Sequence, residues 1–140
     1  MIVNKNEFFR KITMQLGTMP KKNAEIACLK SANLVKNSAM ESIMTGAKTG
    51  RAYKKGSVTR IASAPGEAPA NQTGALVGSL SARVESQGTV TTGIASASTA
   101  YAAMLEFGTQ KMAARPYMQP ALDKNAAAIK AIFIKQGLIT

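Results

Sequence analysis

Histidine is absent from this chain of 140 residues, which contains one cysteine and seven acidic residues. Without histidine, neither a Ser-His-Asp triad nor a Cys-His pair can form. A zinc ion would find one thiolate and scattered carboxylates, and no two carboxylates are spaced as a paired general acid and base. The sequence therefore predicts that the protein is not an enzyme, and it indicates no cofactor, metal or small-molecule substrate.

Long apolar runs are also lacking. The first residues, MIVNKNEFFRKI, carry charges where a secretory signal needs an uninterrupted apolar stretch. The single cysteine, Cys28, excludes an intrachain disulfide and lies in an apolar helical pattern, where a thiol acts as a small hydrophobe. With 46% hydrophobic residues, the composition suits one domain of ordinary size. We expect a single cytoplasmic domain over residues 1–140 that does not enter a membrane.

Positive charge is in excess, with a formal net charge of +11. Residues 1–60 contain twelve Lys or Arg and three Glu, whereas residues 61–140 contain six basic and four acidic residues. The densest basic stretch, KTGRAYKKGSVTR, has no acid, and its cations are Lys48, Arg51, Lys54, Lys55 and Arg60. Such a surface attracts a phosphate backbone or an acidic protein, and a solvated hairpin without a partner is the alternative. Only seven Phe and Tyr occur, so we expect no base reading.

Two helices are predicted in the first third of the chain. The segment EFFRKITMQL, from Asn6, suggests a short helix that Gly17 ends. From Lys21 no helix breaker occurs until Gly46. Within this long helix an apolar stripe recurs every three or four residues, at Cys28, Ala32, Val35, Ala39 and Ile43.

Two strand pairs are predicted after this helix. Apolar residues alternate along residues 79–85 and again along 89–94, with Ser-Gln-Gly at 86–88 as the loop. This loop places Val84 opposite Val90 and Leu80 opposite Ile94, so the apolar faces coincide. A weaker pair surrounds Lys55-Gly56, with Tyr53 near Val58.

The C-terminal third predicts two helices. The first, near residues 101–107, has Tyr101, Met104 and Leu105 on one face and ends at Gly108. The second begins near Pro116, and its apolar face comprises Met118, Leu122, Ala126, Ile129 and Phe133. The fold class is therefore α+β: a long N-terminal helix packed on a small antiparallel sheet, with a short helix and a C-terminal helix.

A stiff segment, SAPGEAPANQTGALVGSL, fills residues 63–80. Pro65 and Pro69 fix their own φ angles, and Gly66 permits a sharp turn beside Glu67. We expect residues 63–73 to form an extended arm that protrudes from the domain or wraps around a neighbour. A surface loop without a partner is the alternative.

The LEFGT and ARPY stretches combine apolar and charged residues. Leu105 and Phe107 supply apolar anchors, and we expect Glu106 to lie within reach of Arg115 once the intervening loop folds back. These residues either hold the fold together or contact a partner, and the pattern leaves both open.

Three motifs carry a resemblance to a known family. TGRAY (49–53), ASAPGEAPANQTGAL (62–76) and YAAMLEFGTQKMAARPYMQPAL (101–122) together cover about half the chain. In this order and spacing they resemble the head–tail joining or tail-completion family of long-tailed bacteriophages, in the form of a lambdoid minor tail component described as gene-product-ten-like.

The resemblance implies a structural virion protein of a phage or prophage, at the neck or tail terminus. It implies a homo-oligomeric ring, assembled in the host cytoplasm between the connector and the tail tube, with DNA passing through its centre. The candidate subunit-interface residues are Pro65, Gly66, Glu67, Pro69, Leu105, Glu106, Phe107, Arg115, Pro116 and Tyr117. The five cations of residues 48–60 would contact passing DNA or an acidic neighbour. The alternative function is a free-standing basic protein that binds the nucleic-acid backbone non-specifically.

Overall fold

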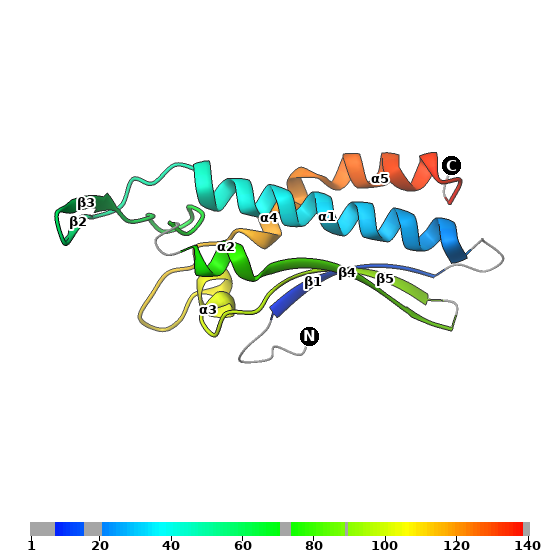
Figure 1. The fold of residues 1–140 in the computed structure, drawn as a ribbon, viewed down its shortest axis with the longest axis horizontal. Helices are drawn as coiled ribbons and strands as arrows, with labels where there is room; N and C mark the ends of the chain where they lie inside the picture. The colour runs from blue at the N-terminus through cyan, green and yellow to red at the C-terminus, as the bar shows by residue number, and fades with distance from the viewer. Residues whose placement is uncertain (1–7, 16–20, 71–73, 89, 139–140) are drawn as a thin grey trace.

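The structure is a computed structural model that describes residues 21–70, 74–88 and 90–138, and the backbone of residues 8–15. Its elements form an α+β arrangement in which a long helix covers one face of a small antiparallel sheet (Figure 1). In chain order they are β1 (Phe8–Gln15), α1 (Lys21–Thr45), β2 (Ala52–Lys55), β3 (Val58–Ile61), α2 (Ala75–Ser79), β4 (Leu80–Gln87), β5 (Val90–Ala97), α3 (Ala102–Phe107), α4 (Met118–Lys124) and α5 (Ala126–Lys135).

The main sheet has three antiparallel strands in the order β1-β5-β4. β1 occupies the segment that the sequence predicts as a helix, so the prediction is wrong for residues 8–15. Residues 6 and 7 of the predicted helix lie outside the described part. Phe8, Phe9, Ile12 and Thr13 belong to residue types that favour strands. Pairing with all eight residues of β5 decides between the two conformations.

The β4–β5 hairpin is confirmed, but its register differs from the predicted one. Leu80 lies opposite Ala97 and Val84 opposite Gly93, and the paired strands continue to Gln87 opposite Val90. Opposed residues share a face, so Ile94 lies opposite Arg83 and not with Leu80. The predicted coincidence of apolar faces is therefore wrong.

The long helix is confirmed, and so is its stripe. The residues of α1 that are buried are Ala24, Ala27, Cys28, Ser31, Ala32, Val35, Ala39 and Ile43. Most have small side chains, which lets the helix lie close to β5: the Cys28 thiol is 3.7 Å from the Thr91 carbonyl oxygen. Burial raises the pKa of this thiol. The backbone of α1 thus approaches the sheet more closely than large side chains would allow.

The C-terminal helix is interrupted. The sequence predicts one helix from Pro116, whereas the structure has α4 and α5 separated at Asn125. The Asn125 side-chain amide donates to the Ala121 carbonyl oxygen at 2.7 Å, a local bond that competes with the helical backbone pattern. Ile129 and Phe133 are buried as predicted, but Ala126 is exposed. Both helices pack against α1.

A second hairpin, β2–β3, projects beyond the C-terminal end of α1 (Figure 1). It confirms the weaker strand pair of the sequence, with Tyr53 opposite Arg60 and Lys55 opposite Val58. Gly56 has a φ of 65° in the turn, a conformation that glycine adopts without steric cost. The projection gives the molecule a cationic end that is remote from α5.

We predict that Gly93→Ala destabilises the protein by about 1–3 kcal/mol. A Cβ atom at this position would lie 2.5 Å from the Cys28 carbonyl oxygen, so α1 would have to shift. The matched control is Gly78→Ala in α2, where a Cβ meets nothing within 4 Å, and we expect it to be neutral or stabilising by less than about 1 kcal/mol. Urea unfolding of both variants checks this, and equal free energies of unfolding would contradict close packing at Gly93.

Candidate assembly interface

Three segments that are distant in sequence meet at the base of the projecting hairpin. The Thr49 amide donates to the Glu67 carboxylate at 2.9 Å, which ties the start of the hairpin to the 63–70 loop. The Gly66 amide donates to the Ala114 carbonyl oxygen at 3.0 Å, which ties that loop to the connection between α3 and α4. We call this arrangement of residues 49–50, 62–67 and 113–115 the hairpin base.

Glu67 is the acceptor at the centre of the hairpin base. Its carboxylate accepts the backbone amides of Ala64 and Thr49 and also the Thr49 hydroxyl. These bonds, with Lys48 nearby, lower the pKa of Glu67 from 4.5 to about 2. The ionised carboxylate therefore fixes the position of the hairpin on the domain, a role inside the chain that its sequence context did not predict.

Arg115 strengthens the same junction. Its guanidinium donates to the Ser63 carbonyl oxygen at 3.2 Å and to that of Ala113 at 3.2 Å. Its backbone amide donates to the Leu105 carbonyl oxygen at 2.6 Å. These bonds hold the two loops together, while the expected approach of Arg115 to Glu106 stays a prediction.

Glu106 has a different function. Its side chain is only 4% exposed and its carboxylate accepts three backbone amides, from Tyr117 at 2.8 Å, Met118 at 3.0 Å and Gln119 at 2.8 Å. These amides belong to the start of α4, where an acidic side chain also interacts favourably with the helix dipole. Glu106 therefore anchors α4 to α3.

Tyr117 is also internal. It is fully buried, and its hydroxyl donates to the Ala102 carbonyl oxygen at 3.0 Å, while burial raises its pKa above the ordinary value. Pro116 beside it is half-buried. Of the ten predicted interface residues, Glu106 and Tyr117 thus hold the fold together within one chain.

The predicted arm is folded against the domain as far as residue 70. Pro65 and Gly66 are exposed, but Pro69 is buried, and the backbone of Gly66 is bound to Ala114. The arm therefore has an apolar anchor at Pro69 that the sequence reading overlooked. Residues 71–73, the end of the predicted arm, lie outside the described residues.

An apolar hollow lies between this loop and α3. It has a volume of about 520 Å³, and its lining includes Pro69, Tyr101, Leu105 and Arg115. Leu105 packs against the core, whereas Phe107 is 44% exposed. Only the first of the two predicted anchors is therefore a core residue.

The cations of residues 48–60 divide into two groups. The Lys48 ammonium donates to the carbonyl oxygens of Ser42 at 3.3 Å and Gly46 at 3.2 Å, so it caps the C-terminal end of α1. Desolvation lowers its pKa. Lys48 therefore belongs to the C-terminal end of α1 and not to the outer hairpin surface.

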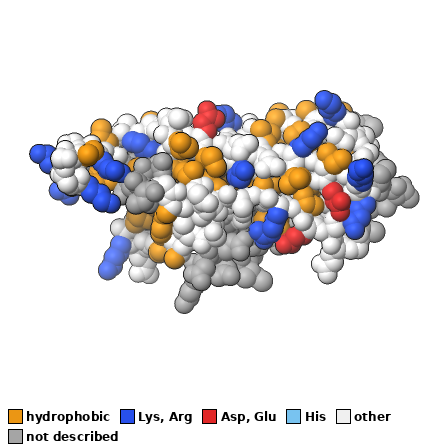
Figure 2. Space-filling model, viewed as in Figure 1, with side chains coloured by type: hydrophobic (Ala, Val, Ile, Leu, Met, Phe, Trp, Pro, Cys, Tyr) orange, Lys and Arg blue, Asp and Glu red, His pale blue; other side chains and the backbone are white. Residues whose placement is uncertain are grey.

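The remaining cations lie on the hairpin itself, where blue side chains gather at one end of the molecule (Figure 2). Arg51, Lys54 and Lys55 are exposed, and Arg60 is half-buried. Strand pairing places Lys55 on the face that holds Tyr53, Val58 and Arg60, while Lys54 lies on the opposite face with Thr59 and Ile61.

Two large apolar side chains accompany these charges. Val58 is 52% exposed and Ile61 is 51% exposed, one on each face of the hairpin. The odd spacing between Val58 and Ile61 places them on opposite faces of a strand, and in the described residues the sheet has only the strands β2 and β3. The hairpin thus offers cations and apolar surface together.

Sequence reasoning missed the polar groups that build the hairpin base. Thr49 and the Ser63 carbonyl group matter because loops that are far apart in sequence fold next to each other, which no local pattern records. The only available signal was an acid, Glu67, two residues after a proline turn, where a carboxylate can accept neighbouring backbone amides.

Other kinds of site find no support in the part of the chain that the structure describes. Within it, no three His, Cys, Asp or Glu side chains come together as metal ligands would. Among the described helices, none combines the length and the apolar content that crossing a bilayer requires.

Comparison of the chain with protein-family models, curated proteins and solved structures gave no significant match. The geometry of the hairpin and its base therefore carries the functional argument together with the motifs.

We predict that Glu106→Ala destabilises the protein by about 3 kcal/mol or more, because three backbone amides lose a charged acceptor in a buried place. Phe107→Ala, at the adjacent but 44% exposed position, serves as the matched control and should cost less. The sequence offered Phe107 as an apolar anchor and left open whether it holds the fold together or contacts a partner. Thermal and urea unfolding measure both, and a larger loss for Phe107→Ala would contradict the assigned role of Glu106.

We predict that the hairpin base loosens in acid. Because the folded-state pKa of Glu67 is about 2, below its ordinary 4.5, the stabilisation is complete above pH 4.5 and disappears as the pH falls through 2. Amide exchange of Thr49 and Ala64 should quicken in that window relative to core amides. In Glu67→Gln their exchange should already be faster at neutral pH, and unchanged protection in that variant would rule out the carboxylate as the fastening group.

Proposed function

We propose that this chain is a structural subunit of the neck of a long-tailed phage or prophage, where it helps to join the DNA-filled head to the tail as part of a ring. The observation that carries the proposal is the meeting of three segments at the hairpin base. Thr49, Glu67 and Arg115 each belong to a different one of the motifs that resemble the head–tail joining family. The three motifs thus meet at one end of the fold. Motifs that together form one docking surface would be expected to meet in this way.

The hairpin is the part of this end that reaches away from the domain. Its cations attract an acidic surface over a distance of about a Debye length, and they also set the orientation of the encounter. Val58 and Ile61 add apolar contact area, which a protein partner buries and which a phosphate backbone does not. This combination favours an acidic neck protein as the first partner of the hairpin.

Contact with passing DNA is the second candidate. Lys55 and Arg60 share one hairpin face, and cations on a channel wall would attract the phosphate backbone without reading bases. A free-standing nucleic-acid-binding protein would use the same face, and would bind DNA as an isolated chain with a steep dependence on salt concentration.

Complementation in a phage that carries this gene tests the proposal. Deletion of the gene should yield full heads and unattached tails, which electron microscopy counts directly. Joined, infectious particles from the deletion strain would refute the neck role.

Lys54→Glu with Lys55→Glu, supplied in trans, should leave the fold intact because both side chains are exposed. We expect the number of infectious particles to fall on the order of tenfold or more, since charge reversal turns attraction into repulsion. The matched control is Lys130→Glu with Lys135→Glu on α5, which changes the net charge equally at exposed positions away from the hairpin.

The kind of defect assigns the partner of the hairpin. Unjoined heads and tails mean docking onto a protein, whereas joined particles that fail to eject DNA mean a channel role. Full infectivity of the hairpin variant, or an equal loss in the α5 control, would show that the hairpin has no partner.

A further inference from the structure

Strand β4 forms one edge of the main sheet. It pairs with β5 along its whole length, from Leu80 opposite Ala97 to Gln87 opposite Val90, without a bulge. On its other side no strand pairs with it in the part of the chain that the structure describes. Edge strands are commonly protected by proline, charged side chains or a bulge, and of these LSARVESQ has only the charged pair Arg83 and Glu85. β4 is therefore an eight-residue template for another strand.

The charges along β4 are complementary to themselves. If two antiparallel β4 strands meet about a two-fold axis at Val84, each Arg83 lies opposite Glu85 of the other copy. The same register places Ala82 opposite Ser86 and therefore brings no like charges together. Directly opposed residues of opposite charge stabilise a strand pair, so this register is the favoured one.

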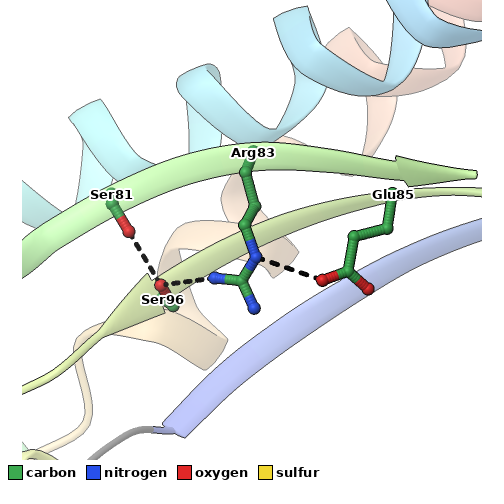
Figure 3. Close-up of polar contacts among 4 residues, drawn as sticks. All are labelled: Ser81, Arg83, Glu85 and Ser96. Carbon is green, nitrogen blue, oxygen red and sulfur yellow. Dashed lines mark hydrogen bonds and ion pairs between the residues drawn. The ribbon is translucent and has the colours of Figure 1, made fainter.

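Both charged side chains lie on one face of the sheet, the face on which such a junction would set them opposite each other. Arg83 and Glu85 extend from β4 on the side of the sheet that faces away from α1 (Figure 3). They form an ion pair at 3.3 Å, and their side chains are 41% and 61% exposed. The Ser96 hydroxyl, 2.8 Å from that of Ser81 and 3.4 Å from the Arg83 guanidinium, holds the arginine along the sheet (Figure 3).

The other side of the edge is incompletely filled and is lined by apolar and polar side chains, the polar ones being Lys22, Glu25 and Ser86. A hollow of about 430 Å³ lies between α1 and β4; Ile26, Leu29 and Val84 form its apolar part, and Leu29 is 42% exposed. No β5 residue lines it, which places it at the outer edge of the sheet. A second copy would bring the same three residues to it from the opposite side.

The helices leave room for this pairing. α1 packs on both β4 and β5, so an axis midway between these strands would lie half a strand spacing inside β4. The two-fold axis would lie about half a spacing outside β4, so the two α1 axes would be roughly 10 Å apart. Packed helices are separated by about 8–10 Å, so Leu29 of each copy would meet the other helix in contact and without overlap.

We propose that β4 pairs with β4 of a second copy about a two-fold axis at Val84, so that two three-stranded sheets become one continuous sheet. The pairing does not rest on the phage assignment, because it uses the flank of the fold and not the hairpin. The self-complementary charges identify a second copy of the chain as the partner. Another protein that added a strand here would not need Arg83 and Glu85 in this alternating order.

The full-length chain should therefore sediment at about twice 14.7 kDa at micromolar concentration. Arg83→Glu makes both opposed pairs acidic and Glu85→Arg makes both basic, so each variant alone should dissociate on the order of 100-fold more readily. An equimolar mixture of the two variants should form a dimer of one chain of each, because the acidic edge then meets the basic edge.

Mixing the two variants can restore opposite charges between chains, but it cannot restore the ion pair within one chain. A dimer in the mixture therefore reports pairing between chains. Lys130→Glu on α5 is the control for a change of charge alone, and it should remain dimeric. Thermal unfolding within a few degrees of the native chain verifies that each variant folds. A monomeric native chain, a dimer that both variants leave intact, or a mixture that stays monomeric would each overturn the proposal.

Discussion

The close approach of α1 to β5 is the constraint from which the rest of the arrangement follows. Where the Cys28 carbonyl lies against Gly93, there is no space for a Cβ atom on the strand, so the helix side of β5 must carry small residues. Ala95 and Ala97 continue this side. The larger Ile94 is consequently placed on the opposite face, and with it the polar cluster of Arg83, Ser96 and their neighbours.

Two carboxylates then shape the end of the molecule. Glu106 collects the backbone amides at the start of α4, and Glu67 collects those at the hairpin base. Each carboxylate accepts hydrogen bonds from backbone amides that have no partner in regular secondary structure. A hydrogen bond to a charged acceptor is about twice as strong as one to a neutral acceptor. In a chain with seven acidic residues, this internal use leaves the outer surface dominated by cations. The projecting end is thus cationic partly because Glu67 and Glu106 accept backbone amides within the fold.

The sequence predicts the elements that rest on their own periodicity and fails where a distant partner decides. The stripe of α1 from Cys28 to Ile43 is a helical pattern over four turns, and all five of its predicted members are buried. Residues 8–15 have no such pattern, and only β5 makes them a strand. The β4–β5 register was missed because turn length alone cannot reveal that the helix excludes Ile94 from its side of the sheet.

The same distinction applies to the site. The exposed cations of the hairpin follow from composition and strand alternation, so Arg51, Lys54 and Lys55 could be placed from the sequence. Glu106, between Leu105 and Phe107, is surrounded by apolar residues and invites the assumption that the charge points outward. Burial of Glu106 depends on three amides that arrive from eleven to thirteen residues later in the chain. Such an arrangement is visible only once the α3–α4 loop has closed.

Symmetry separates the two surfaces that the fold leaves for association. A contact about a two-fold axis uses one surface twice and is complete with two chains, whereas a ring joins two different surfaces of successive subunits. The β4 edge runs along the flank, and the hairpin leaves from the end of α1 (Figure 1). Because no residue of the hairpin belongs to β4, the two proposed contacts use different residues. The pair proposed for β4 would therefore keep both cationic hairpins available, one from each chain, and assembly onto a larger partner would not require the pair to separate first.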